Sequence, residues 1–321
     1  MFAWRMMAAA IAAAAISGAA EAQTIGIVST GPGSYTHSAS SAIAKLLVER
    51  AGLQARVQPQ IASPSINVEA GTGDLGLTNS FDSVFFITGT GEYEGQGPRP
   101  NLRAVANLVP LRTAMHVRKD SGIKTIAEIK GKRVGGGFTA QKTIARIIEA
   151  HLANAGLSYD DVRPVLAPNV GAAADDFGAG KSDAFFFALG SAKVKEVGAK
   201  VGGLRAIPID PSPGAIARAE KILPGAYALK IQPAPNIEGV EREMHIIGFD
   251  FILNTNNKVA DDVIYKITKV LFENGKEMGT SFPPLRAFDP AKMVKSYPPL
   301  EYHSGAIKFF REKGMWPPKQ S

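Results

Sequence analysis

The segment Ser29-Thr30-Gly31-Pro32-Gly33-Ser34-Tyr35-Thr36 is the stretch from which the fold of this chain can be inferred. An apolar run at residues 24–28 precedes it and predicts a buried strand, and an amphipathic helix is predicted to follow. A second segment of the same kind, Gly135-Gly136-Gly137-Phe138-Thr139-Ala140-Gln141, also joins a predicted strand to a predicted helix. The chain therefore contains two similar α/β units.

The spacing within the two units supports this repeat. Each loop is followed by a Gly-x-Gly segment and a further strand, and 42 residues separate Gly31 from Gly73 while 43 separate Gly137 from Gly180. Free N–H groups and the positive end of a helix dipole favour an anion at such a loop. Two units that face each other would clamp a ligand between them.

The remaining pattern predicts alternating strands and helices. The first helix is expected to open at Ser40 or Ser41, strands at 102–109 and 113–117 flank Pro110, and a strong helix covers 260–274. This alternation predicts an α/β protein with mainly parallel strands, and the two-unit organisation suggests two lobes. Lobe I is expected to comprise residues 23–112 with 248–321, and lobe II residues 113–247.

The first 22 residues have the pattern of a secretory signal peptide. Arg5 lies in the short region before an apolar run at 8–16, and Ala20-Glu21-Ala22 matches a cleavage site. The apolar run is shorter than the ~20 residues of an ordinary membrane span. We therefore expect cleavage after Ala22 and export of the protein, with an uncleaved anchor as the alternative.

The composition narrows the class of protein further. The 321 residues include no Cys, so an exported chain of this length must rely on its own hydrophobic core rather than on disulfides. Lys and Arg number 36 against 29 Asp and Glu, a formal charge of +7. The basic residues are scattered, which argues against nucleic acid as a partner and is compatible with a small anionic ligand.

Candidate binding residues follow from the two loops and from the ends of the strands. In open α/β sheets, ligands bind outside the carboxyl ends of the strands. Asp82 is interpreted as a helix cap, and Arg112 as a bidentate partner for a carboxylate or as a surface residue. Thr139 is interpreted as an anion contact, as the N-cap of the helix that follows, or as both. Phe186 and Phe187 alternate across a strand, so one of them is expected in the core. The candidate ligand-binding residues are Ser29, Thr30, Gly31, Tyr35, Asn79, Ser80, Phe81, Arg112, Gly137, Phe138, Thr139, Ala140, Gln141, Phe186 and Phe187.

Metal and catalytic sites are not indicated. The five His residues are far apart in the sequence and lack metal-binding spacing, and the Gly loops match neither a Walker A nor a dinucleotide motif. No cofactor or metal is therefore expected. Ser34 and His37 form a pair without an identified acid, which leaves a secreted hydrolase as an alternative function.

The chain resembles the TAXI-type solute-binding proteins of TRAP transporters over nearly all of the expected mature sequence. The matching segments follow the family's order and comprise the first Gly loop and residues 73–80, 117–123, 129–134, 180–186, 262–274 and 309–314. The resemblance implies a periplasmic binding protein with two α/β lobes joined by a hinge, which closes on a small, often carboxylate-bearing ligand. We expect the protein to be a monomer. It also implies delivery to a TRAP permease driven by an ion gradient.

The chain departs from this family in both loops. Pro32, Thr36 and His37 enter the first loop, and Phe138 places a ring where a small polar residue is usual. Phe138 and the run 185–187 suggest a more apolar or aromatic ligand, a hypothesis that binding of small hydrophilic dicarboxylates alone would contradict. A receptor that docks on a signalling protein instead of a permease is a further alternative.

Overall fold

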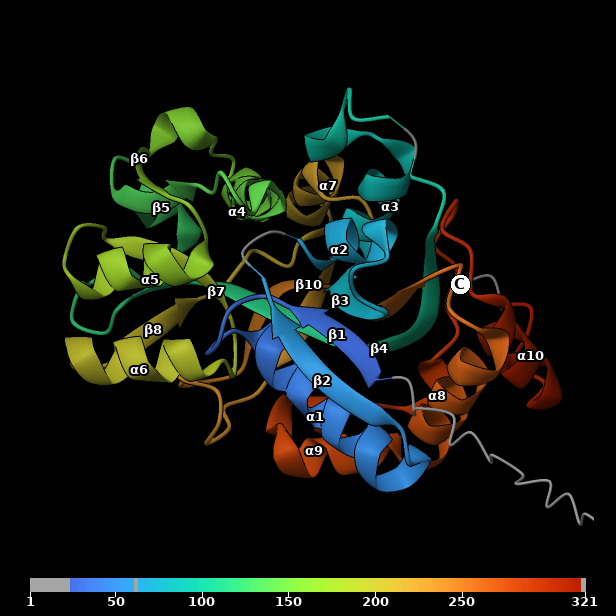
Figure 1. Cartoon of the computed structure of the whole chain (residues 1–321). Coiled ribbons are helices and arrows are strands. Elements are labelled where there is room, and N and C mark those ends of the chain that lie inside the picture. Colours follow the sequence, from blue (N-terminus) through green and yellow to red (C-terminus); the bar gives the residue numbers. More distant parts are fainter. Residues whose placement is uncertain (1–23, 61–62, 98, 319–321) are drawn as a thin grey trace, which may run out of the picture.

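The computed structural model describes residues 24–60, 63–97 and 99–318, and the expected signal peptide lies outside these ranges. Figure 1 shows a central sheet with helices around it. The strands are β1 Thr24–Ser29, β2 Gln54–Pro59, β3 Leu75–Asn79, β4 Leu102–Arg118, β5 Arg133–Gly137, β6 Arg163–Ala167, β7 Ala184–Ala188, β8 Leu204–Ile207, β9 Tyr227–Ile231 and β10 Met244–Asn256.

Ten α-helices occur in the described residues. They are α1 Tyr35–Ala51, α2 Pro64–Ala70, α3 Ser80–Thr88, α4 Lys142–Asn154, α5 Val170–Gly178, α6 Ala192–Val201, α7 Pro213–Ile222, α8 Asp261–Asn274, α9 Met278–Ser281 and α10 Ser304–Glu312. In Figure 1, α4, α5 and α6 lie with β5 to β8 on one side, while α1, α8, α9 and α10 lie around the other side.

The sheet is mixed rather than mainly parallel. Its strand order is β2-β1-β3-β10-β4-β7-β5-β6, with β8 beside β4 and β9 beside β10. The β1–β2, β1–β3, β5–β6 and β5–β7 pairs are parallel, whereas every antiparallel pair involves β4 or β10. The two α/β units are therefore parallel internally, and two long antiparallel strands connect them.

Strand β4 corrects the expectation of two strands that flank Pro110. It runs unbroken from Leu102 to Arg118 and pairs Pro110 with Asp250 of β10. Because proline cannot donate to the ladder, it is tolerated next to irregular pairing, and the register shifts between Phe251 and Ile252. The strand pair β4–β10 is consequently the continuous link between the two halves of the molecule.

Two predicted helix starts are also corrected. Helix α1 begins at Tyr35, because the Ser34 side chain accepts a hydrogen bond from the His37 N–H at 3.1 Å and caps the helix there. Helix α4 begins at Lys142 with Gln141 at the N-cap position, so Thr139 does not cap it. Helix α1 thus begins earlier than the sequence pattern indicated, and α4 begins later.

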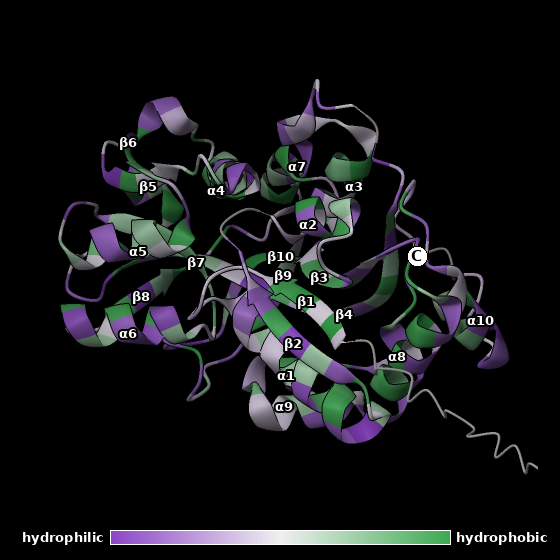
Figure 2. Ribbon diagram, viewed as in Figure 1, coloured by the Kyte–Doolittle hydropathy of each residue, from purple (hydrophilic) through white to green (hydrophobic). Residues whose placement is uncertain are grey.

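The hydrophobic core lies between the sheet and its helices. Figure 2 shows hydrophobic residues concentrated in the central strands, with hydrophilic residues on the outer faces of the helices. The largest buried cluster extends from Ile25 of β1 through Phe249 of β10 to Phe310 of α10. Burial at ~25 cal/mol per Å² of apolar surface makes this cluster the main source of stability in a chain without disulfides.

Candidate functional site

The loop between β1 and α1, residues 30–34, positions hydroxyl groups at the end of β1. The Thr30 hydroxyl donates to Ser34 Oγ at 2.7 Å, and the Ser34 N–H donates to the Gly31 carbonyl at 3.2 Å. Ser29 is fully buried, and its hydroxyl donates to the Thr30 carbonyl. The loop is therefore held by its own hydrogen bonds and directs the first turn of α1 toward the cleft.

Tyr35 is the first residue of α1 and is buried, with 3% of its surface exposed. Its ring packs edge-on against Phe251 at 5.5 Å and Phe282 at 4.9 Å between ring centroids. Its hydroxyl has no hydrogen-bond partner among the described residues, and burial raises its pKa, so it remains a neutral donor. A buried hydroxyl without a partner is costly unless a ligand or water satisfies it.

The end of β3 contributes Asn79 and, in the first turn of α3, Asp82. The Asp82 carboxylate accepts hydrogen bonds from the Tyr93 hydroxyl at 2.7 Å, the Thr143 hydroxyl at 2.8 Å and the Ser63 hydroxyl at 3.0 Å. Burial raises the pKa of Asp82 above its usual value, although these hydrogen bonds act in the opposite direction. Asp82 is thus a buried hydrogen-bond acceptor for three side chains from different segments, and not the helix cap that the sequence suggested.

The second half of the molecule contributes Gln141, Thr143 and the end of β7. Gln141 Oε1 accepts from the Val170 N–H at 3.1 Å, which leaves the side-chain NH₂ group as a donor. Phe186, Phe187 and Ala188 come from the carboxyl end of β7, where β4 pairs Thr113 with Ala188. This agrees with the rule that ligands bind beyond the carboxyl ends of strands.

These side chains enclose two adjoining cavities, which we call the inner and outer cavities. The inner cavity has a volume of about 110 Å³, and most of its lining residues are buried. The outer cavity has a volume of about 400 Å³ and is lined by more exposed residues, including Gly31, Gln60 and Lys193. Both cavities are lined by Thr30, Ser34, Gln141, Val170 and Phe187.

Several contacts join the two halves beside the cavities. Thr143 of α4 donates to Asp82 of α3, and Arg146 of the same helix forms an ion pair with Glu92 at 2.6 Å. At the opposite edge, the Lys193 N–H of α6 donates to the Gly33 carbonyl at 3.2 Å. The described conformation is therefore a closed one, in which both halves surround the inner cavity.

The candidate residues divide into two groups. Seven line a cavity: Thr30, Gly31, Tyr35, Asn79, Gln141, Phe186 and Phe187. Eight line neither cavity: Ser29, Ser80, Phe81, Arg112, Gly137, Phe138, Thr139 and Ala140. Both Phe186 and Phe187 reach the inner cavity because it lies at the end of their strand and not over one face of it.

The second loop is arranged differently from the sequence expectation. Phe138 is fully buried in the core with a positive φ of 35°, and Thr139 is exposed. The Ala140 N–H donates to the Pro168 carbonyl at 3.0 Å and the Gln141 N–H to the Phe138 carbonyl at 3.0 Å. These two N–H groups are therefore engaged within the protein.

Sequence reasoning missed several wall residues. Ser63, Thr113, Thr143 and Phe251 line the inner cavity, and three of them carry hydroxyl groups. Their positions depend on strand pairing and on α3–α4 packing, which no local motif encodes. The only available signal was that Thr143 lies in the first turn of a helix after a Gly loop.

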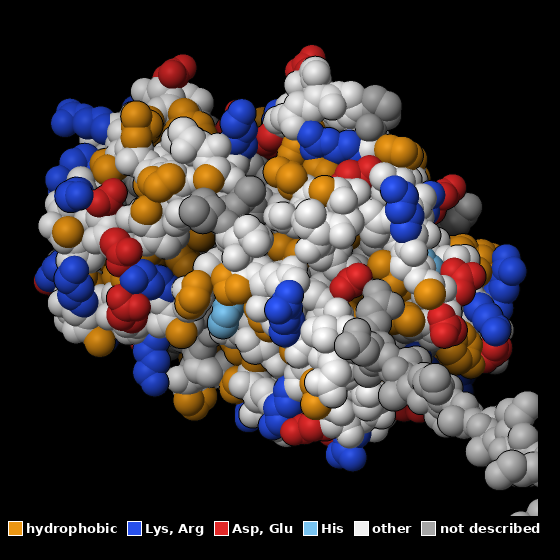
Figure 3. Space-filling model, in the orientation of Figure 1, with side chains coloured by type: hydrophobic (Ala, Val, Ile, Leu, Met, Phe, Trp, Pro, Cys, Tyr) orange, Lys and Arg blue, Asp and Glu red, His pale blue; other side chains and the backbone are white. Residues whose placement is uncertain are grey.

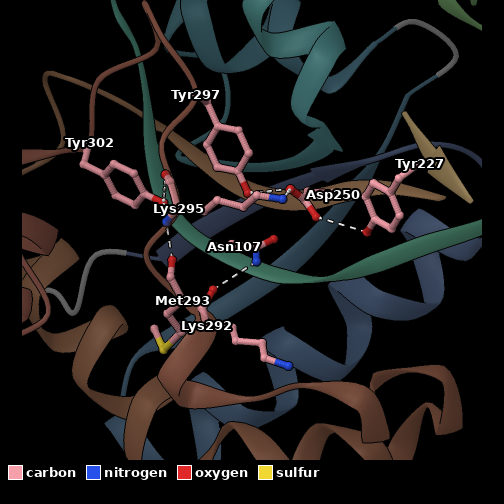
Figure 4. A network of polar contacts seen from close by, with 8 residues as sticks. All are labelled: Asn107, Tyr227, Asp250, Lys292, Met293, Lys295, Tyr297 and Tyr302. Atoms are coloured by element: carbon pink, nitrogen blue, oxygen red, sulfur yellow. Dashed lines mark hydrogen bonds and ion pairs between the residues drawn. The ribbon is translucent and has the colours of Figure 1, made fainter. Parts of the chain in front are cut away.

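A second polar network lies beside β4 and β10. Figure 4 shows Asp250 of β10 surrounded by Tyr227, Lys295 and Tyr297. Lys295 forms an ion pair with Asp250, the Tyr297 hydroxyl donates to it at 3.2 Å and the Tyr227 hydroxyl at 3.4 Å. This network therefore fastens the C-terminal segment to β10, the strand that links the two halves.

The outer surface has no region dominated by one charge on the face in Figure 3, where Lys and Arg alternate with Asp and Glu. No helix in the described part of the chain is long and apolar enough to cross a membrane. In the same part, no group of three His, Asp or Glu side chains is placed to hold a metal ion.

The comparisons with known proteins identify a family and a fold. The model of the NMT1-like family matches residues 25–314. A solved periplasmic transporter protein is 15% identical, with a TM-score of 0.54 over 81% of this chain and 86% of its own. PhnD1 from Prochlorococcus marinus MIT 9301, solved with methylphosphonate, is 12% identical, with a TM-score of 0.54 over 91% and 98%.

A third solved structure is similar to the chain. The alkanesulfonate-binding protein SsuA from Xanthomonas axonopodis pv. citri, bound to MOPS, is 16% identical, with a TM-score of 0.50 over 92% and 94%. At these identities the similarity concerns the fold. The predicted two-lobed periplasmic-binding-protein fold is confirmed.

Proposed function

Because the chain belongs to the NMT1-like family and has the two-lobed periplasmic-binding-protein fold, we propose that it is an extracytoplasmic receptor for a small organic molecule. The observation that supports this most directly is the inner cavity, to which both halves contribute walls. Residues such as Tyr35 and Asn79 come from one half, and Gln141 and Phe187 from the other. A ligand held there contacts both halves and stabilises the closed conformation.

The hinge of this receptor lies at the middle of β4 and β10. We place lobe I at residues 23–112 with 248–321 and lobe II at 113–247. These boundaries face each other in the ladder, since Arg112 pairs with Gly248 and Thr113 with Ile247. Two adjacent strands that both cross there permit the lobes to bend as units.

The receptor is proposed to act in the periplasm and to release its ligand to a membrane permease. The ordered sequence segments support an ion-gradient-driven TRAP permease, and an ATP-driven ABC importer is the alternative. Uptake into cells separates them, because an ionophore abolishes transport through a TRAP permease and ATP depletion at a maintained gradient abolishes transport through an ABC importer.

A hydrolase at Ser34 and His37 is the competing function. Ser34 Oγ accepts hydrogen bonds from the Thr30 hydroxyl and from the His37 backbone N–H. This serine thus serves as the cap of α1, which gives the His37 side chain no part in activating it.

Native mass spectrometry of the purified chain, after incubation with an extract of small metabolites, tests the receptor proposal. We expect one bound compound per chain, released unchanged on denaturation. Ile144→Trp should abolish binding by filling the inner cavity, whereas Val48→Trp, on the exposed face of α1, should not. Consumption of the compound would support the hydrolase, and the absence of any bound compound would contradict the proposal.

A further inference from the structure

The charges on the cavity walls restrict the ligand. Among the described residues, the inner cavity is lined by one ionisable acid, Asp82, and by no Lys or Arg. The outer cavity is lined by Lys193 with Asp175 and Glu196. Lys193 Nζ lies 2.6 Å from Asp175 and 2.8 Å from Glu196, so two carboxylates already neutralise this cation. Within the described part of the chain, neither cavity is thus lined by an unpaired positive side chain.

Two further sources of positive charge lie near the inner cavity. Arg112 lines neither cavity; its guanidinium donates to the Pro284 carbonyl at 3.4 Å, and its charge acts on Tyr35, whose pKa it lowers against the larger effect of burial. The second loop uses the N–H groups of Ala140 and Gln141 internally. The remaining donor-rich wall is the start of α1, where Tyr35 and Thr36 line the cavity and the first helical N–H groups lack helical partners.

The walls instead provide apolar surface and neutral donors. Leu77, Leu111, Ile144, Ile147 and Phe186 line the inner cavity. Tyr35 also lines this cavity, and its buried hydroxyl has no hydrogen-bond partner in the described structure.

We propose that the receptor binds an uncharged ligand with an apolar body and a hydrogen-bond acceptor, such as an amide or carbonyl oxygen, which receives the Tyr35 hydroxyl. This inference rests on the proposed function and replaces the carboxylate expected from the sequence. A carboxylate moved from water into this cavity would lose its hydration and gain no charged side chain in return, only the partial positive charge at the start of α1, whereas an amide loses much less hydration.

Matched probes of one shape and different charge test the proposal. Isothermal titration calorimetry of the full chain with phenylacetamide and phenylacetate, and with pentanamide and pentanoate, compares neutral and anionic forms. We expect each amide to bind at least tenfold more tightly than its carboxylate at pH 7.5.

Two variants connect this preference to the cavity. Tyr35→Phe removes only the unpartnered hydroxyl and should weaken amide binding about tenfold, whereas Tyr159→Phe, whose hydroxyl donates to the Ala145 carbonyl, should not. Gln141→Lys places a cation where the two cavities meet and should shift the preference toward the carboxylate.

The failure of this inference can be distinguished from that of the receptor proposal. Equal or tighter binding of the carboxylates, or no binding of any of the four probes, would overturn the neutral-ligand inference. The mass-spectrometric search would still identify a charged ligand in that case. Unchanged amide affinity in Tyr35→Phe would overturn the assignment of the acceptor position.

Discussion

At the scale of single residues, burial changes the pKa of side chains in this protein. Two histidines, His116 on β4 and His151 on α4, are fully buried in the second half of the molecule. His116 stacks on Phe185 at 5.1 Å between ring centroids, and neither of its ring nitrogens has a partner among the described residues. Burial lowers the pKa of His116 to about 3 and that of His151 to about 4.

These histidines predict a loss of stability in mild acid. Below pH ~6.5, the pKa of histidine in the unfolded chain, the unfolded chain binds protons at these two side chains and the folded chain does not. The free energy of unfolding therefore falls as the pH falls, until the pH reaches the pKa values of the folded protein. Between pH 6.5 and 4.5 each His should cost on the order of 2–3 kcal/mol. The raised pKa of Asp82 acts in the opposite direction, since its folded form gains protons first.

His116→Phe isolates this effect, because the phenyl ring retains the stacking and cannot be protonated. Urea unfolding at pH 7.5 and pH 4.5 should show the variant gaining stability relative to the parent as the pH falls. Parallel pH profiles for the two proteins would contradict the assignment.

At the scale of elements, helix packing depends on close backbone contacts. Helix α10 packs against the start of α8, and a Cβ atom added at Gly305 would lie 2.2 Å from the Asp261 carbonyl oxygen and 3.0 Å from the Tyr265 nitrogen. Both of these atoms belong to the backbone, so no side-chain rotation can move them away from the added Cβ atom. Only glycine permits this approach of the two helices.

Gly305→Ala should therefore destabilise the protein by about 1–3 kcal/mol, measured by urea unfolding. Gly214→Ala is the matched control, because Gly214 lies in α7 with no atom within 4 Å of the added Cβ. That control should be neutral or slightly stabilising, since alanine favours helix. Equal stability of the two variants would show that α10 moves without cost.

The elements also show which sequence signals were reliable. The strand at 24–28 and the helix at 260–274 were predicted within a residue or two, because apolar periodicity there reflects one buried face. Helix starts at the two loops were predicted less well. Ser34 caps α1 through a local hydrogen bond, but Gln141 begins α4 in a conformation that depends on the packing of Phe138 in the core.

At the scale of the whole molecule, closure depends on contacts between the halves. Thr143 donates to Asp82 across the cleft, and Asp82 keeps its other donors, Ser63 and Tyr93, within its own half. Thr143→Val removes the donor that crosses between the halves and leaves the others in place. The closed state should lose stability relative to the open state.

We expect Thr143→Val to increase the radius of gyration of the ligand-free protein in small-angle X-ray scattering. The affinity for a ligand identified by mass spectrometry should fall several-fold, because less of the protein is in the binding-competent closed state. Thr88→Val is the control, since the Thr88 hydroxyl donates within α3. An unchanged radius and affinity would show that this bond does not govern closure.

The sequence by itself determined the two-unit α/β plan, the strand ends that border the cleft, and a core able to fold without disulfides. These features follow from periodicity, glycine placement and composition, which are local properties of the chain. The tertiary structure alone decided that Phe138 is core, that Asp82 joins the halves and that Arg112 stays outside the cavity. Charge balance in the cleft arises from residues that are distant in sequence, so only their packing shows that, among the described residues, no Lys or Arg lines the inner cavity and Lys193 of the outer cavity is paired with two carboxylates.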